Sequence, residues 1–320
     1  MNRRNEQIEA VSGWWNTERN KEKWDRAYIK TNVHGRMYLK TRQRRVLNYM
    51  NEAGLKEGSR VLELGYGAGQ TALELGKRGF EVYGLDISEK FREVASARCR
   101  RMHPEGKFYL KTGNIESNYE FKDGFFDAVV VVGALQYLYD PSVCLREVFR
   151  VLRPGGFFVV AQRNIYSLSN LTSPREFARA CAHFFLREKY ELFPSFKSIL
   201  VDSKLGCIFK RFEGSKFFNT RFMLKGHDEW KFKIKKRINS YFSLKSILKR
   251  EGFATLKADG AYYCVSETPR FFYINLKADR LIEKINGKLR IPYLFTLGRS
   301  IVLLCKKGAR EAFLQRSGGM

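Results

Sequence analysis

Residues 61–70 read VLELGYGAGQ, an apolar run that ends in three glycines at alternate positions, Gly65, Gly67 and Gly69. Glycine tolerates positive φ angles and leaves the backbone bare, so a ligand can touch main-chain N–H groups directly. A helix that begins after such a loop directs further unpaired N–H groups at the same point. The stretch therefore predicts a strand, a ligand-binding loop and the start of a helix.

The blocks that follow alternate between strand-like and helix-like composition, which is typical of βαβ units and a parallel sheet. Ser88 is a candidate N-cap for the helix after it. Together these blocks predict an α/β fold with a doubly wound, mostly parallel, seven-stranded sheet. Strands are expected at 60–65, 81–88, 107–115, 125–135, 157–164, 254–265 and 299–307, and helices at 70–79, 89–102, 141–156 and 242–253.

Three regions are predicted along the chain. Between strand five and the helix at 242–253 the composition becomes basic and aromatic, with a helix expected near 174–190 and, in WKFKIKKR (230–237), a strand with one cationic face. Such a surface suits an anionic lipid interface or RNA, and the alternative is a small lid whose phenylalanines only pack against the sheet. The regions are an N-terminal helical cap laid over the sheet at 1–57, the α/β domain at 58–307 with its insertion at about 165–240, and a mobile tail at 308–320.

The charge of the chain is strongly positive. Its formal net charge is +26, and residues 161–320 hold 32 Lys and Arg against 13 Asp and Glu. This excess attracts anionic partners. The six cysteines are scattered without a CxxC pair, so we expect reduced thiols and no metal site. No signal peptide or membrane-spanning run is evident, which predicts a cytoplasmic protein that can contact a membrane peripherally.

Polar side chains follow the first strands at the edge where open sheets bind ligands. Residues 67–72 also satisfy the looser dinucleotide pattern GxGxxA, so the loop alone leaves NAD open. The carboxylate of Asp86 can accept hydrogen bonds from both hydroxyls of a ribose, with helix capping as its alternative role. Asn114 and Ile115 can pair with and pack on an adenine ring. Glu63, inside a buried strand, needs a partner, and it suits the ammonium of S-adenosylmethionine better than a pyrophosphate.

The ordered motifs of the chain resemble those of class I S-adenosylmethionine-dependent methyltransferases, of the methyltransferase type 11 kind that acts on small molecules and lipids. The resemblance covers residues 58–163 and resumes at FSLKSILKREGF (242–253) and RSIVLLCKK (299–307), which are similar to the last helix and final β-hairpin of that family. It implies a Rossmann-like methyltransferase fold. The motifs are VLELGYGAG (61–69), YGLDIS (83–88), GNIE (113–116), FDAVVVVGALQYLYDP (126–141) and REVFRVLRPGGFFVVAQ (146–162).

The resemblance also implies S-adenosylmethionine as the cofactor and a role for individual residues. An N-terminal aromatic often closes this pocket in the family, and Tyr28 is one candidate among the aromatic residues of this chain. Gln136 and Tyr137 lie near the acceptor, where they are expected to position it. The cofactor-binding residues that it implies are Glu63, Gly65, Gly67, Gly69, Asp86, Ile87, Asn114, Ile115, Gly133 and Leu135, with Ala134 beside the sulfonium.

The segment after the fourth strand bears on the acceptor. Many members carry His where this chain has Tyr137, so acid/base assistance at that position is in question. GALQYL (133–138) differs from the Asn/Asp-Pro-Pro-aromatic motif typical of nucleobase methyltransferases. A small or lipid-linked acceptor is therefore expected, methylated on O, N or C. The alternatives are an RNA-modifying methyltransferase, a NAD-dependent oxidoreductase and a non-catalytic member that only binds cofactor.

Overall fold

The strands of the protein form the predicted sheet. The computed structural model describes residues 3–30, 33–172, 177, 221–223, 233–235, 238–264, 272–289 and 294–308. Within them a seven-stranded sheet runs in the order β3-β2-β1-β4-β5-β9-β8, parallel from β3 to β5 and antiparallel on both sides of β9. The predicted fold class is thus confirmed. The strands are β1 (Arg60–Leu64), β2 (Glu81–Asp86), β3 (Phe108–Thr112), β4 (Phe126–Val132), β5 (Leu152–Arg163), β8 (Phe253–Ala261) and β9 (Ser300–Lys307).

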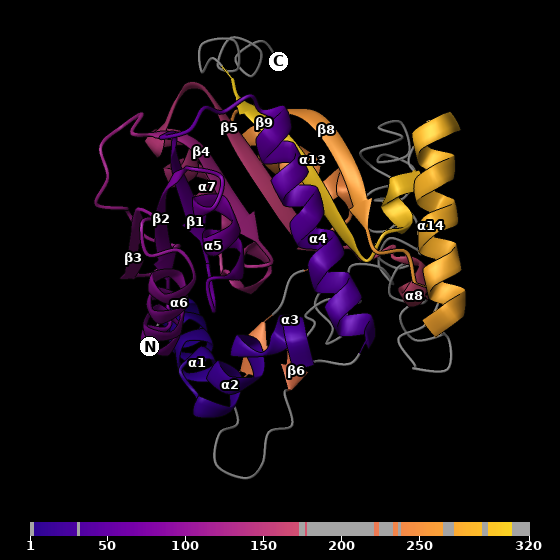
Figure 1. Ribbon diagram of the computed structural model, residues 1–320, viewed down its shortest axis with the longest axis horizontal. Coiled ribbons are helices and arrows are strands. Elements are labelled where there is room, and N and C mark those ends of the chain that lie inside the picture. The colour runs from indigo at the N-terminus through magenta and orange to yellow at the C-terminus, as the bar shows by residue number, and fades with distance from the viewer. Residues whose placement is uncertain are drawn as a thin grey trace, which may run out of the picture.

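Helices cover both faces of this sheet (Figure 1). On one face pack α7 (Pro141–Val151) and α13 (Tyr241–Arg250), and on the other α4 (Val33–Glu52), α5 (Gln70–Gly76) and α6 (Glu89–Met102). Because side chains alternate along a strand, β1 divides its residues between the two layers. Leu62 and Leu64 join the first layer and Val61 joins the second.

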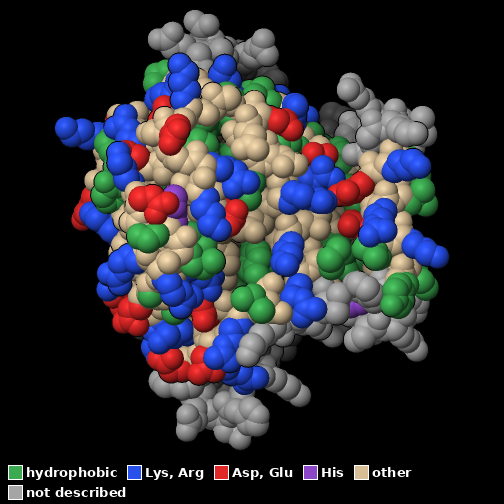
Figure 2. Space-filling model, viewed as in Figure 1, with side chains coloured by type: hydrophobic (Ala, Val, Ile, Leu, Met, Phe, Trp, Pro, Cys, Tyr) green, Lys and Arg blue, Asp and Glu red, His purple; other side chains and the backbone are tan. Residues whose placement is uncertain are grey.

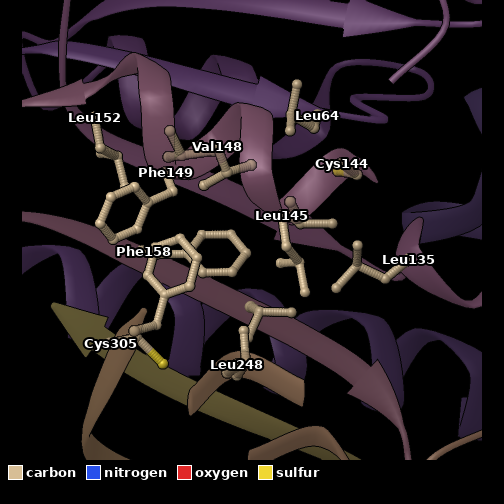
Figure 3. Close-up of a cluster of buried hydrophobic side chains, with 14 of the residues drawn as sticks. Leu64, Leu135, Cys144, Leu145, Val148, Phe149, Leu152, Phe158, Leu248 and Cys305 are labelled. Carbon is tan, nitrogen blue, oxygen red and sulfur yellow. The ribbon is translucent and has the colours of Figure 1, made fainter. Parts of the chain in front are cut away.

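The first layer forms a continuous hydrophobic cluster. Figure 3 shows Leu145, Val148 and Phe149 of α7 facing Phe158 of β5 and, from α13, Leu248. These side chains are less than 10% exposed. The cluster fixes the sheet and with it the edge where the strands end.

The ends of several elements explain where the predicted boundaries shift. The Ser88 hydroxyl accepts the N–H of Phe91 and caps α6, as predicted. Helix α7 ends at Val151, five residues before the predicted end, because the following Arg-Pro-Gly-Gly segment is part of β5. Strand β4 ends at Val132 rather than 135, since Gly133 turns the chain with a φ of 77° into the short 3-10 helix η1 (Leu135–Tyr137).

The N-terminal region is helical and reaches two parts of the sheet. Three short helices, α1 (Arg3–Trp15), α2 (Glu18–Asp25) and α3 (Ala27–Lys30), gather at one end of the sheet (Figure 1). Helix α4 instead lies across β5, β8 and β9. The Tyr38 hydroxyl lies 2.7 Å from that of Ser300, which fastens α4 to β9.

The later part of the chain differs from expectation in one respect. Helix α14 (Phe272–Leu289) and the 3-10 helix η4 (Leu294–Leu297) stand between β8 and β9, so α13 is not the last helix. The outer face of α14 carries exposed Tyr273, Ile274 and Leu281, which obscures an amphipathic pattern in the sequence. Among the described helices, none is long and apolar enough to cross a membrane.

Only short parts of the insertion are described. Helix α8 is Leu168–Leu171, and β6 (Arg221–Met223) pairs antiparallel with β7 (Lys233–Lys235), which packs beside α1. Strand β7 falls within the segment 230–237 that was predicted to be extended. The helix expected near 174–190, apart from Phe177, and the tail expected after residue 308 lie outside the described residues.

Candidate functional site

A cavity opens at the carboxyl ends of β1, β2 and β4, where the strand order reverses. Open parallel sheets bind their ligands at such a switch point. The space between its walls that no atom fills amounts to about 830 Å³, and this volume includes space that is open to solvent. Most residues predicted from the sequence lie in its wall, namely Gly65, Gly67, Asp86, Ile87, Asn114, Ile115, Gly133, Ala134, Gln136 and Tyr137.

Three predicted cofactor residues do not line the cavity. Leu135 is only 3% exposed and packs into the hydrophobic cluster, where Figure 3 shows it beside Leu145. Gly69 caps α5, and a Cβ added to it would stand 2.7 Å from the Cβ of Ala95, so the glycine allows α5 and α6 to approach. Glu63 lies behind the wall, on the face of β1 that carries α5.

Gly67 differs from Gly69 because no protein atom lies where its side chain would be. Its φ is 53°, and a Cβ added there would have no atom within 4 Å. Since Gly67 lines the cavity, this bare stretch of backbone faces the ligand space. The loop thus offers main-chain contact at the point that the sequence pattern predicts.

Asp86 holds the glycine loop against β2. Its Oδ2 accepts the N–H of Gly67 at 2.8 Å and its Oδ1 that of Ser88 at 2.9 Å. The side chain is 7% exposed, and burial raises its pKa to about 6 although both hydrogen bonds lower it. Each carboxylate oxygen keeps a further lone pair for a ligand hydroxyl. The capping role and a ribose-binding role are therefore compatible.

Glu63 is a buried acid without full hydrogen bonding. Its side chain is 2% exposed, and Oε2 has no partner among the described residues. Burial, and then the charge of Asp86, raise the pKa of Glu63 to about 8, against a hydrogen bond from the Ala72 backbone. At neutral pH the carboxyl is thus mostly protonated. A neutral acid behind the wall gives less support to an ammonium than the sequence argument assumed.

Two tryptophans of the N-terminal helices close the cavity on one side. The rings of Trp15 and Trp24 meet edge to face with centroids 5.8 Å apart, and Trp15 also lies 5.5 Å from the ring of Tyr137. The Ser88 hydroxyl donates to the Trp15 carbonyl and the Gln70 amide to the Trp24 carbonyl. The helices are thus tied to the starts of α5 and α6, and these tryptophans, rather than Tyr28, line the cavity.

Gln136 and Tyr137 belong to η1 and also line the cavity, with the ring of Tyr137 next to that of Trp15. Gln136 is 5% exposed, and its Oε1 has no hydrogen-bond partner in the described part of the chain. Burial raises the pKa of Tyr137, although Arg163 and a hydrogen bond with Gln136 lower it. The phenol therefore stays protonated at neutral pH, so it can donate a hydrogen bond to an acceptor but does not serve as its base.

Other wall residues were not predicted from the sequence. The apolar ones, such as Val11 and Phe91, belong to helices whose contact with the cavity follows only from the fold. The tryptophans carried a composition signal, but nothing in the segment KTRQRR singles out Arg42, which also lines the cavity. In the described ranges, no group of three or more His, Cys, Asp or Glu is placed to hold a metal ion.

The chain is similar to known proteins in its central part. Residues 62–160 match the sequence model of a methyltransferase domain. The chain is 30% identical over 134 residues to a demethylmenaquinone methyltransferase of Tropheryma whipplei, covering 42% of this chain and 51% of that protein. It is 31% identical over 114 residues to the ubiquinone/menaquinone biosynthesis C-methyltransferase of Edwardsiella ictaluri, covering 34% and 45%. The chain spans about half the length of these relatives.

Solved structures share the fold over most of the chain. Magnesium protoporphyrin IX methyltransferase from Synechocystis, with bound SAH, superposes with a TM-score of 0.53 at 14% identity and covers 93% of this chain and 98% of that one. Phosphoethanolamine N-methyltransferase 2 of Haemonchus contortus, in complex with S-adenosyl-L-methionine, gives 0.51 at 17%, covering 92% and 58%. At these identities the likeness concerns the fold.

Proposed function

Because the chain belongs to the class I S-adenosylmethionine-dependent methyltransferases through its domain at residues 62–160, we propose that it methylates an oxygen, nitrogen or carbon nucleophile of a small-molecule acceptor. The family match favours methyl transfer over the hydride transfer of a dinucleotide-dependent oxidoreductase. Relatives with the names of quinone methyltransferases support a small acceptor rather than RNA.

The observation that carries this proposal is the composition of one cavity wall. Gly67 offers open backbone, Asp86 a buried carboxylate, and Ile115 an apolar surface beside Asn114. These groups fit the amino-acid end, the ribose hydroxyls and the adenine of S-adenosylmethionine, respectively. The residues of this wall would hold the cofactor, with Ile87 and Phe91 adding apolar contact.

The chemistry needs alignment more than acid/base groups. A sulfonium cofactor held by this wall would supply a methyl carbon to an electron pair of the acceptor's oxygen, nitrogen or carbon, and the electrons of the carbon–sulfur bond would remain on sulfur as a neutral thioether. Trp15 and Trp24 cover one side of the cavity, which limits the access of water to a methyl group held there. Gln136 and the protonated Tyr137 orient the acceptor by hydrogen bonds.

We also propose that the protein contacts anionic membranes peripherally, on the evidence of α14. Its outer face combines Tyr273, 77% exposed, and Leu281, 57% exposed, with Lys277, Arg280 and Lys284. These positions lie within one side of the helix, since they are spaced by three and four residues. Figure 2 shows the hydrophobic and basic side chains together over the place of α14. Lipid headgroups and acyl chains offer the matching chemistry.

Calorimetric titration tests the cofactor part of this proposal. S-adenosylhomocysteine and NADH are titrated separately into the protein. Saturable binding of S-adenosylhomocysteine without binding of NADH supports the proposal. Binding of NADH alone contradicts it and favours the oxidoreductase alternative, whereas S-adenosylhomocysteine binding without turnover across an acceptor screen favours a non-catalytic member.

A further inference from the structure

Arg42 is a buried cation in the wall of the cavity. It comes from α4, it is 7% exposed, and it lies at the end of the cavity that Gln136 and Tyr137 also form. A Cβ added to Gly133 would stand 2.9 Å from its Nη1. The glycine after β4 therefore leaves the room that the guanidinium occupies. This brings a fixed positive charge next to the segment expected to border the reacting methyl group.

The groups that contact Arg42 are neutral. Its Nη1 donates to the Tyr38 hydroxyl at 3.2 Å, and the phenol of Tyr28 also lies close enough to influence the pKa of the guanidinium. Its Nε has no hydrogen-bond partner in the described part of the protein, and no described carboxylate forms an ion pair with it. An unpaired charge in such surroundings is costly unless an anion accompanies it.

Nearby arginines reinforce the positive potential. The Cζ of Arg299 lies 4.4 Å from the ring centroid of Tyr38, and that of Arg42 lies 5.0 Å from it. Burial alone would raise the pKa of Tyr38, but the charges of Arg42, Arg163 and Arg299 outweigh burial and lower it. Three guanidinium groups are thus close enough to Tyr38 to lower the pKa of its phenol.

The buried acids of the same region do not balance this charge. Glu63 is mostly protonated at neutral pH, since its pKa is about 8. The carboxylate of Glu116 accepts hydrogen bonds from the backbone N–H groups of Tyr139 and Asp140, and its Oε1 lies 3.6 Å from the Nε of Arg4. Asp86 accepts a hydrogen bond from the N–H of Gly67 in the glycine loop. None of these described acids therefore forms an ion pair with Arg42.

We propose that Arg42 binds a negatively charged oxygen group of the methyl acceptor, a carboxylate or a phosphate. This inference rests on the proposed function, which makes this end of the cavity the acceptor site. The guanidinium of Arg42 lines the cavity, and the planar arrangement of its N–H donors matches two oxygens of either group. The acceptor is thus an anion, and Arg42 selects it over uncharged analogues.

The test uses small aromatic probes on protein saturated with S-adenosylhomocysteine. Benzoate carries the carboxylate, phenyl phosphate the phosphate, and benzamide neither charge. Binding is followed by the fluorescence of Trp15 and Trp24, which line the cavity. At least one of the two anions should bind about tenfold or more tightly than benzamide, as one charge-assisted hydrogen bond allows. The stronger anion distinguishes carboxylate from phosphate. Equal affinity for benzamide, or no binding of either anion, overturns the proposal.

Two variants and one control separate binding from structure. Arg42→Gln should remove the preference for the anion, whereas Arg42→Lys should keep part of it because the charge remains. Arg44→Gln is the matched control, since Arg44 lies on the same helix but pairs with Glu283 outside the cavity. Its preference should equal that of the wild type.

Affinity for S-adenosylhomocysteine separates this inference from the proposed function. If the wild type does not bind S-adenosylhomocysteine, the proposed function fails, and the anion preference is then measured on the cofactor-free protein by the same criteria. If Arg42→Gln keeps the anion preference of the wild type, the assignment of Arg42 is wrong while the methyltransferase function stands. If Arg42→Gln does not fold, the comparison of the three probes on the wild type still decides.

Discussion

Gly67→Ala is expected to abolish most cofactor binding while it costs only modest stability. Gly67 adopts a φ of 53°, so an alanine there is strained by about 1–2 kcal/mol in the left-handed region. The new methyl group meets no protein atom within 4 Å, so strain is the whole cost to the free protein. It projects instead into the cavity that the cofactor is proposed to fill. We expect affinity for S-adenosylhomocysteine to fall about tenfold or more, the equivalent of about 1.4 kcal/mol.

Gly54→Ala supplies the matched control. Gly54 has a φ of 66°, and a Cβ added to it also has no atom within 4 Å, but it does not line the cavity. Both variants should lose similar stability in urea unfolding, and only Gly67→Ala should lose affinity in calorimetry. Equal affinity of the two variants would refute the argument that the bare backbone of Gly67 contacts the cofactor.

Asp86→Ala should weaken S-adenosylhomocysteine binding about tenfold or more in calorimetry, because it removes charge-assisted hydrogen bonds to the ribose and to the loop; unchanged affinity contradicts the site. Burial raises the pKa of Glu63 from 4.5 to about 8. Between these two pH values, the Glu63 carboxyl is protonated in the folded protein but ionised in the unfolded chain. Rising pH therefore destabilises the native state in this window. Urea unfolding should therefore show Glu63→Gln gaining stability over the wild type as pH rises through this window, and a constant difference would exclude the raised pKa. Replacing both Tyr273 and Leu281 by Ser should reduce sedimentation with anionic vesicles at low salt without changing S-adenosylhomocysteine affinity, and Lys284→Gln should reduce it further; vesicle binding that ignores these changes rules out α14 as the contact.

The core of the fold could be predicted because its signals are local. The Val-rich run of β4, the cap of α6 at Ser88 and the glycines after β1 specify elements without help from distant residues. The edge at which parallel strands end then brings Gly67 and Asp86 together, although they are far apart in sequence. This part of the site follows from the order of the elements.

The remainder depends on tertiary packing that no local pattern reveals. Glu63 can face either the ligand or α5. Its direction depends on which side chains of β1 point to each face of the sheet and on where α5 packs. Leu135 follows a turn that directs it into the core instead of the cavity. Arg42 is one of several basic residues on α4, and only its position across from Gly133 distinguishes it. Helix α14 also carries apolar residues on its exposed face, so its sequence lacks the regular spacing of apolar residues by which a helix is recognised.

Methyl transfer itself tests the central claim most directly. The protein is incubated with S-adenosylmethionine that carries a deuterated methyl group and with a small-molecule extract, and both products are followed by mass spectrometry. The account predicts that S-adenosylhomocysteine and a product heavier by the labelled methyl group appear together, in equal amounts, and only when the protein is present. Absence of any labelled product across extracts, with the cofactor bound but not consumed, would contradict the assignment of this protein as a methyltransferase.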